Sequence, residues 1–168
     1  VIFGINASKL MEISEKSDFQ NLARAKTQLI RQEFFDLRKN IDAMAGYINL
    51  VGVNDEIFNK LAQPVVKSSM VYEVQWIELN DDGQPTSFFS LTDKGDGIEK
   101  DKWIKNALIQ KRIDEAVKKR MSSVFEYFNK NNEMEWLVLT PSYENSKKEA
   151  SGVIISAIDS HFIENCSF

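Results

Sequence analysis

Few side chains in this sequence are placed to do chemistry, and the first of them are acidic. Asp93, Asp96, Glu99 and Asp101 fall within a short stretch that also contains Gly and Lys. Carboxylates are ligands that Ca²⁺ prefers, but an EF-hand loop needs oxygen donors at alternate positions and a Glu at its last position. Neither requirement is met, so we expect an ordinary solvated loop here rather than a metal site.

A thiol and an imidazole lie near the end of the chain. Cys166 is the single cysteine and His161 the single histidine. On a helix, their separation would place them roughly 140° apart, on different faces, so the histidine could not act as a base for the thiol. The sequence also has no Gly-rich phosphate loop, no serine nucleophile motif and no paired histidines. We therefore expect no catalytic residue, no metal and no cofactor, and predict that this chain is not an enzyme.

Aromatic and polar side chains are concentrated instead in stretches with the alternating pattern of strands. Ligand pockets are mostly apolar, with a few polar groups that fix the ligand. The residues that we predict to bind a ligand are Tyr72, Trp76, Glu78, Phe88, Ser90, Trp136, Thr140 and Tyr143. The alternative is that the aromatic members of this set fill the core, which holds for most of them.

The composition limits the partners that the chain can have. Its 168 residues, 43% of them apolar, are enough for one domain with a real core. The net charge is -4, so no strong field attracts nucleic acid. No stretch reaches the roughly 18 to 20 apolar residues of a membrane span. The short apolar ends, VIFGIN and HFIENCSF, are interpreted as remnants of a longer chain.

The stretch from about residue 7 to residue 51 is predicted to form one long helix. It contains no proline and a single late glycine, Gly46, and at 1.5 Å per residue it would be roughly 60 Å long. Spacings of four and three alternate, as in a heptad seam, along Phe19, Ala23, Lys26, Ile30, Phe34, Leu37, Ile41, Met44, Ile48 and Val51. The seam after Ile30 should pack on its own subunit.

The earlier part of this helix is predicted to be a stalk. A helix that projects beyond its domain leaves apolar side chains exposed unless a second chain covers them. We therefore predict a parallel homodimer with an interface formed by Leu10, Ile13, Phe19, Leu22 and Leu29. The alternative is a helix that folds back on its own subunit.

The remainder of the chain is predicted to alternate between helices and an antiparallel sheet. A second helix should span about residues 54–70, with Asn54 as its N-cap and a kink or restart near Pro64. Two strands joined by the turn NDDG follow, then a helix from about Lys100 to Arg120, three more strands, and from about residue 160 the start of a last helix. The fold class is α+β, a single domain with about five strands over residues 71–159.

Two blocks of the sequence resemble the CHASE family of extracytoplasmic sensor domains and the related Cache sensors. The first is the long helix running into DEIFNKLAQPVVKSSMVYEVQWIEL. The second is EWLVLTPSYENSKKEASGVIISAID, with a turn at Thr140 and Pro141, an aromatic at Tyr143, and Gly152 opening a strand that ends in Asp159. The resemblance implies a long helix packed on a PAS-like sheet. No ligand residues transfer from it.

The resemblance also implies a function and a location. We expect a ligand-sensing ectodomain of a bacterial sensor histidine kinase or diguanylate cyclase, on the periplasmic side between two membrane spans. It would bind a small molecule and transmit a conformational change through the stalk helix. The alternative is a protein-interaction or scaffold module that dimerises through the long helix and has no small-molecule ligand.

Overall fold

Helix α1, Ile2–Val51, is the longest element of the protein. The structure is a computed structural model that describes residues 2–68, 70–93, 102–144, 149–159, 161–162 and 164, and side chains from residue 17 onward except Phe19. The helix contains no proline, and it ends where Gly52 takes φ +82° and donates its N–H to Ile48 O at 2.8 Å. Fifty residues correspond to roughly 75 Å.

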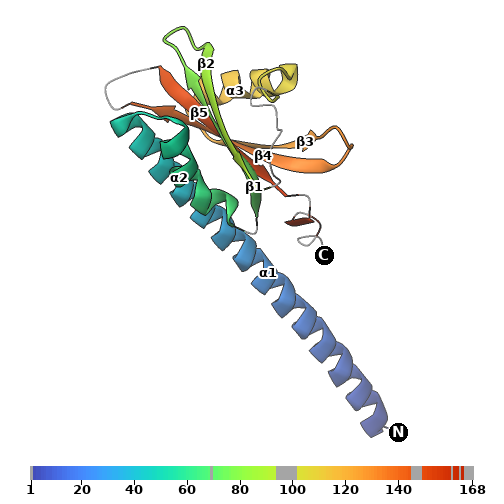
Figure 1. Ribbon diagram of the computed structural model, residues 1–168. Coiled ribbons are helices and arrows are strands. Elements are labelled where there is room, and N and C mark those ends of the chain that lie inside the picture. The colour runs from blue at the N-terminus through green and yellow to red at the C-terminus, as the bar shows by residue number, and fades with distance from the viewer. Residues whose placement is uncertain are drawn as a thin grey trace.

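Among the side chains of α1 that the structure describes, the buried ones all lie in its second half. They include Leu37, Ile41, Met44 and Ile48, so the predicted seam is confirmed as far as Ile48, whereas its last member, Val51, is exposed. The first half continues in line past the sheet instead of folding back on it (Figure 1). Of the predicted interface, Leu22 and Leu29 are exposed, whereas the side chains of Leu10, Ile13 and Phe19 lie outside the described residues.

Helix α2, Asp55–Val66, packs between α1 and the first two strands. Asn54 caps it, because its side chain accepts a hydrogen bond from Ile57 N at 2.8 Å, and Asp55 and Glu56 lie in the first turn. Pro64 lies within the last turn, and the helix continues through it to Val66. The helix therefore does not restart at Pro64, and it ends at Val66 rather than near residue 70 as expected.

The predicted α+β fold with a five-stranded antiparallel sheet is confirmed. The strands are β1 Val71–Leu79, β2 Pro85–Thr92, β3 Ser123–Phe128, β4 Met134–Tyr143 and β5 Ala150–Ile158. Their spatial order is β2-β1-β5-β4-β3, and all neighbours are antiparallel. Asn80 and Gly83 form the β1–β2 turn, in which Gly83 takes φ +76° and donates to Asn80 O at 2.9 Å. The predicted hairpin is therefore present.

The two faces of the sheet have separate apolar cores. Val74, Trp76 and Ile154 face α1 and α2, whereas Ile77, Leu137 and Ile155 face Trp103 and helix α3, Ala107–Lys119. Because side chains alternate along a strand, neighbouring residues of β1 and β5 contribute to opposite cores. The helix α3 begins at Ala107 rather than near Lys100, since Asn106 takes an extended conformation and caps it.

Strand β5 runs back along α1. It begins beside the end of α1, where Ser151 Oγ donates to Asn49 Oδ1 at 2.8 Å. It ends at Ile158, whose partner Trp136 lies 6.4 Å from the ring of Phe34, a residue near the middle of α1. The described chain therefore leaves the sheet on the side toward which the first half of α1 extends (Figure 1).

Candidate functional site

Polar side chains lie within the apolar layer between the sheet and α3. Five of the residues come from strands and two, Lys102 and Trp103, from the turn before α3. We call the set the polar cluster, and it consists of Tyr72, Glu73, Gln75, Ser90, Lys102, Trp103 and Glu135. Glu73, Gln75 and Trp103 each have 0% of their surface exposed. Burying charged and amide groups costs free energy unless each finds a partner. The partners of these side chains therefore decide what the polar cluster can do.

An ion pair between Glu73 and Lys102 joins β1 to the turn that precedes α3. Lys102 Nζ lies 2.5 Å from Glu73 Oε2 and 4.6 Å from the centroid of the Trp103 ring. Ser90 Oγ donates to the other carboxylate oxygen of Glu73 at 3.3 Å. Removing one partner of a buried pair costs about 3–5 kcal/mol, because the other charge is left uncompensated. Glu73 therefore requires a cation beside it.

Gln75 is the next residue of β1 on the same face, and its side-chain amide has no hydrogen-bond partner among the described residues. The same holds for Trp103 Nε1 within that part of the chain. An unsatisfied buried polar group costs about 1–3 kcal/mol, and native proteins retain few of them. The Gln75 amide and the Trp103 indole N–H therefore remain without hydrogen-bond partners from the described residues in this buried layer.

Tyr72 and Glu135 form a second buried contact in the polar cluster. The Tyr72 hydroxyl donates to Glu135 Oε2 at 2.5 Å across strand β5, and Asn129 Nδ2 donates to Glu135 Oε1 at 2.8 Å. Burial, and next the hydrogen bond to Glu135, raise the pKa of Tyr72 far above its ordinary value. The phenol therefore stays protonated and holds β1 and β4 together on this face.

Local hydrogen bonds fix the turn that carries Lys102 and Trp103. Asn106 Oδ1 accepts from Leu108 N at 2.9 Å and from Ile109 N at 3.3 Å. Asn106 N also donates to Trp103 O at 3.1 Å. These contacts join the turn to the start of α3, so a backbone displacement at Lys102 would also displace the start of the helix.

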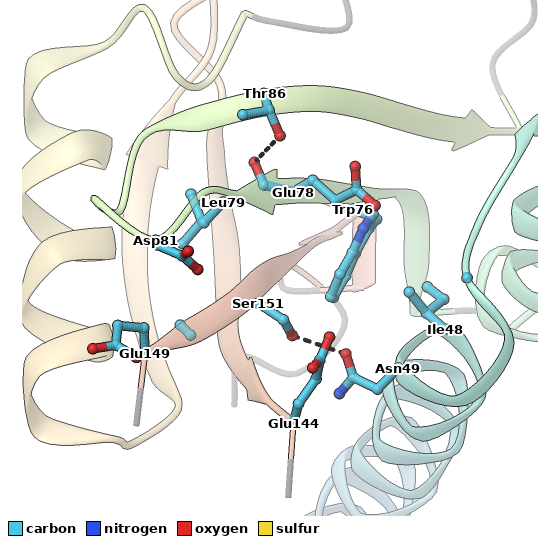
Figure 2. Close-up of a pocket in the computed structure, with 12 residues that line it drawn as sticks. Ile48, Asn49, Trp76, Glu78, Leu79, Asp81, Thr86, Glu144, Glu149 and Ser151 are labelled. Atoms are coloured by element: carbon cyan, nitrogen blue, oxygen red, sulfur yellow. Dashed lines mark hydrogen bonds between the residues drawn. The ribbon is translucent and has the colours of Figure 1, made fainter. Parts of the chain in front are cut away.

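A polar cleft of about 250 Å³ lies on the other side of the sheet, at the end of α1. Figure 2 shows Asn49 approaching Ser151, with the indole of Trp76 beside them. The acidic residues that line this cleft are Glu78, Asp81, Glu144 and Glu149. Asn49 also donates to Ser142 Oγ at 2.8 Å and to Tyr143 O at 3.3 Å, so it connects α1 to both β4 and β5.

Two further clefts flank β4. One, of about 390 Å³, is lined by Arg38, Arg120, Thr140 and Tyr143 among others, and the Arg120 guanidinium stacks 3.8 Å from the centroid of the Tyr143 ring. The other, of about 340 Å³, is an apolar groove between α1 and β3–β4 that includes Phe35. Both clefts lie outside the polar cluster.

The structure distributes the predicted ligand residues over several places. Tyr72, Phe88 and Ser90 lie on the α3 side of the sheet. Trp76 and Glu78 line the cleft at the end of α1. Trp136 packs in the core against α1 and α2, and Thr140 and Tyr143 line the arginine-containing cleft. Only the first group belongs to the polar cluster or packs in the core layer that contains it.

Sequence reasoning did not single out Glu73, Gln75, Lys102, Trp103 or Glu135. A signal for two of them was present, because Glu73 and Gln75 alternate within an otherwise apolar strand and so had to share one face. For Lys102 the pairing joins residues 29 positions apart, and no local pattern indicates it.

Two absences hold within the described ranges. No group of three or more His, Cys, Asp or Glu side chains is placed there to bind a metal ion. None of the helices in those ranges is both long enough and apolar enough to cross a membrane.

The fold is similar to that of solved ligand-binding domains of bacterial chemoreceptors. The ligand-binding domain of Campylobacter jejuni Tlp3 in complex with L-norvaline is 14% identical, with a TM-score of 0.59 over 87% of this chain and 59% of that chain. The same sensory domain with isoleucine bound is 14% identical, with a TM-score of 0.57 over 87% of this chain and 58% of that chain. The ligand-binding domain of the Pseudomonas aeruginosa PAO1 amino acid chemoreceptor PctC in complex with GABA is 11% identical, with a TM-score of 0.55 over 83% of this chain and 59% of that chain.

At these sequence identities, the similarity concerns the fold alone. This chain spans less than two thirds of each of those domains. No family model matches the sequence, and no curated protein matches it either.

Proposed function

We propose that this chain is the ligand-sensing part of a bacterial membrane receptor, and that it binds a small polar molecule at the polar cluster. The observation that carries the proposal is the fully buried Gln75 amide, which has no partner among the described residues and which a bound ligand would satisfy. The fold shared with chemoreceptor ligand-binding domains supports it. Since the ligands bound there are GABA, norvaline and isoleucine, amino acids are the first class to test.

The signal would travel from the sheet to α1. Helix α1 contacts α2, β4 and β5, and Asn49 fastens its end to β4 and β5 through three hydrogen bonds. A ligand shifts the equilibrium between two conformations only through the difference in its affinity for them. A difference of about 1.4 kcal/mol changes the equilibrium constant tenfold. The exposed first half of α1 would carry that displacement away from the sheet.

The receptor context is part of the proposal. A CHASE-type ectodomain on the periplasmic side, followed by a histidine kinase or diguanylate cyclase, would need the chain to enter and leave on the same side of the sheet. The course of β5 back along α1 is consistent with that requirement. A homodimer along the first half of α1 would cover Leu22 and Leu29, whose exposed fractions are 56% and 61%.

A second function, a protein-interaction module without a small-molecule ligand, is favoured by one observation. The apolar groove between α1 and β3–β4 includes Phe35, whose exposed fraction is 58%, and exposed apolar surfaces mark protein contacts. This function would leave the polar cluster without a ligand, so one experiment separates the two.

That experiment is a thermal-shift screen followed by a substitution in the site. The protein is screened with the common amino acids, norvaline, GABA and small primary amines, and a compound that raises the melting temperature is titrated by calorimetry. Gln75→Leu should reduce its affinity at least about tenfold, the effect of one lost hydrogen bond of about 1.4 kcal/mol. The matched control is Gln63→Leu, an exposed position on α2, which should bind as the wild type does.

Gln75→Leu carries a second expectation. It removes a buried amide without partners in the described chain, so the ligand-free variant should be at least as stable as the wild type. A variant that binds the compound normally, or a screen in which no compound raises the melting temperature, would contradict the proposed function and favour the interaction module.

A further inference from the structure

Lys102 is held in the polar cluster by the groups that bind ammonium ions in general. Its Nζ lies 2.5 Å from the fully buried carboxylate of Glu73 and 4.6 Å from the centroid of the Trp103 ring. A carboxylate and an aromatic face together make a site for a primary ammonium. In this structure the ammonium that occupies this site is that of Lys102.

We infer that Lys102 is an internal competitor, which occupies the ammonium position of the site until an ammonium-bearing ligand displaces it. This inference rests on the proposed function, and it adds both a ligand class and a means of regulation. The ligand class is a small primary amine or amino acid. Its ammonium would replace that of Lys102 on Glu73, and its adjoining polar group would meet the Gln75 amide, roughly 7 Å further along β1.

The exposure of the two partners indicates which of them moves. The Lys102 side chain is 23% exposed, whereas that of Glu73 is 0% exposed. Lysine has a flexible stem and a strongly hydrated ammonium, so Lys102 can turn outward into water. Glu73 cannot follow it, and its charge demands another cation. On this inference the position can exchange one cation for another, whereas a neutral molecule of the same shape would leave the Glu73 charge uncompensated.

Displacement of Lys102 would also supply the conformational change. Lys102 belongs to the turn that Asn106 joins to α3, so freeing its side chain releases the one ion pair described between that turn and β1. The competition lowers apparent affinity as well. If Lys102 leaves the site open in one molecule in ten, the measured affinity is about tenfold weaker than the intrinsic one.

The opposite role for Lys102 makes an opposite prediction. If Lys102 stayed in place and bound an anionic group of the ligand, its removal would weaken binding. If it competes with the ligand, its removal strengthens the binding of amines. The sign of one measured change separates the two roles.

The test is chemical rescue of Lys102→Ala in the 168-residue chain. The variant should melt roughly 10 °C lower than the wild type, because Glu73 loses its cation. The probe is n-propylammonium chloride, which replaces the atoms that the substitution removes. It should restore at least about half of the lost melting temperature and bind the variant about tenfold more tightly than the wild type. Neither n-propanol at the same concentration nor potassium chloride at the same ionic strength should restore the melting temperature of the variant.

Two further variants keep the test decisive. Lys111→Ala, at an exposed position of α3, should show neither the loss nor the rescue. The double variant Glu73→Gln with Lys102→Met lacks both charges, so it should fold even if Lys102→Ala alone does not, and n-propylammonium should not stabilise it. Stabilisation of the double variant equal to that of Lys102→Ala would overturn the inference.

The outcome also separates this inference from the proposed function. If n-propylammonium does not rescue Lys102→Ala while Gln75→Leu still weakens binding of the screened compound, Lys102 is not a competitor and the ligand site remains. If neither effect is found, both proposals fail.

Discussion

Tyr72→Phe removes a single hydroxyl from the polar cluster, and its consequence can be worked out from the structure. Tyr72 is 5% exposed and Glu135 is 4% exposed. The hydroxyl donates to Glu135 Oε2, whose companion oxygen accepts from Asn129. Without the hydroxyl, Oε2 loses a charge-assisted hydrogen bond, which is worth about 1.5–3 kcal/mol. For a chain of this size, a loss of about 2 kcal/mol lowers the melting temperature by about 4–8 °C.

The pH dependence gives a second, independent readout of the same contact. Because burial and Glu135 raise the pKa of Tyr72 in the folded protein, the residue ionises only in the unfolded chain once the pH passes about 10. Its contribution to stability is therefore complete below pH 10 and declines as the pH rises, by up to about 1.4 kcal/mol per pH unit. Tyr72→Phe lacks this term, so the stability difference from the wild type should narrow between pH 10 and pH 11.

The assay is urea unfolding followed by circular dichroism at pH 7, 9, 10 and 11. Tyr47→Phe is the matched control, since Tyr47 lies on α1 and is 48% exposed, and it should change stability by less than about 0.5 kcal/mol. Equal midpoints for Tyr72→Phe and Tyr47→Phe at pH 7 would show that the buried hydrogen bond contributes nothing. Parallel pH profiles for the wild type and Tyr72→Phe would show that the pKa of Tyr72 is not raised in the folded protein.

Three further predictions concern the elements around the site. Gly152→Ala would place a Cβ against the Trp76 ring and 2.8 Å from Ile77 O. Urea unfolding should therefore show a loss of about 1–3 kcal/mol in the free energy of unfolding. The control Gly46→Ala, whose added Cβ meets nothing within 4 Å, should not lower the free energy of unfolding. Asn106→Ala removes the cap of α3 and should cost about 1 kcal/mol in the same assay, and equal stability would refute the cap. Leu29→Glu should convert a dimer into a monomer in analytical ultracentrifugation, and a monomeric wild type at high concentration would refute that interface.

The proposed transmission would depend on how the sheet holds α1. Asn49 is the polar part of that attachment, and Phe34 against Trp136 is an apolar part. The two contacts lie at opposite ends of β5, so a change in the sheet acts on α1 at two points.

The sequence by itself determined the elements of this fold. The absence of proline from Ile2 to Val51 permits the long helix, and the seam after Ile30 indicates the half of it that is buried. Alternation and turn residues indicate the strands, as at Asn80 and Gly83. These signals are legible because backbone conformation and binary patterning depend on residues close together in the chain.

Only the tertiary structure decided which polar residues meet. Tyr72 and Glu135 are 63 positions apart and Glu73 and Lys102 are 29 apart, and each pair forms because the antiparallel order places β1 near β4 and beneath the turn before α3. Strict alternation along β1 would place Tyr72 and Trp76 on the same face, but the register irregularity between Val71 and Glu73 puts them on opposite faces. The sequence also does not indicate which face α1 covers. That choice depends on the summed packing of α1 and α2 against the whole sheet, which no local stretch of sequence encodes.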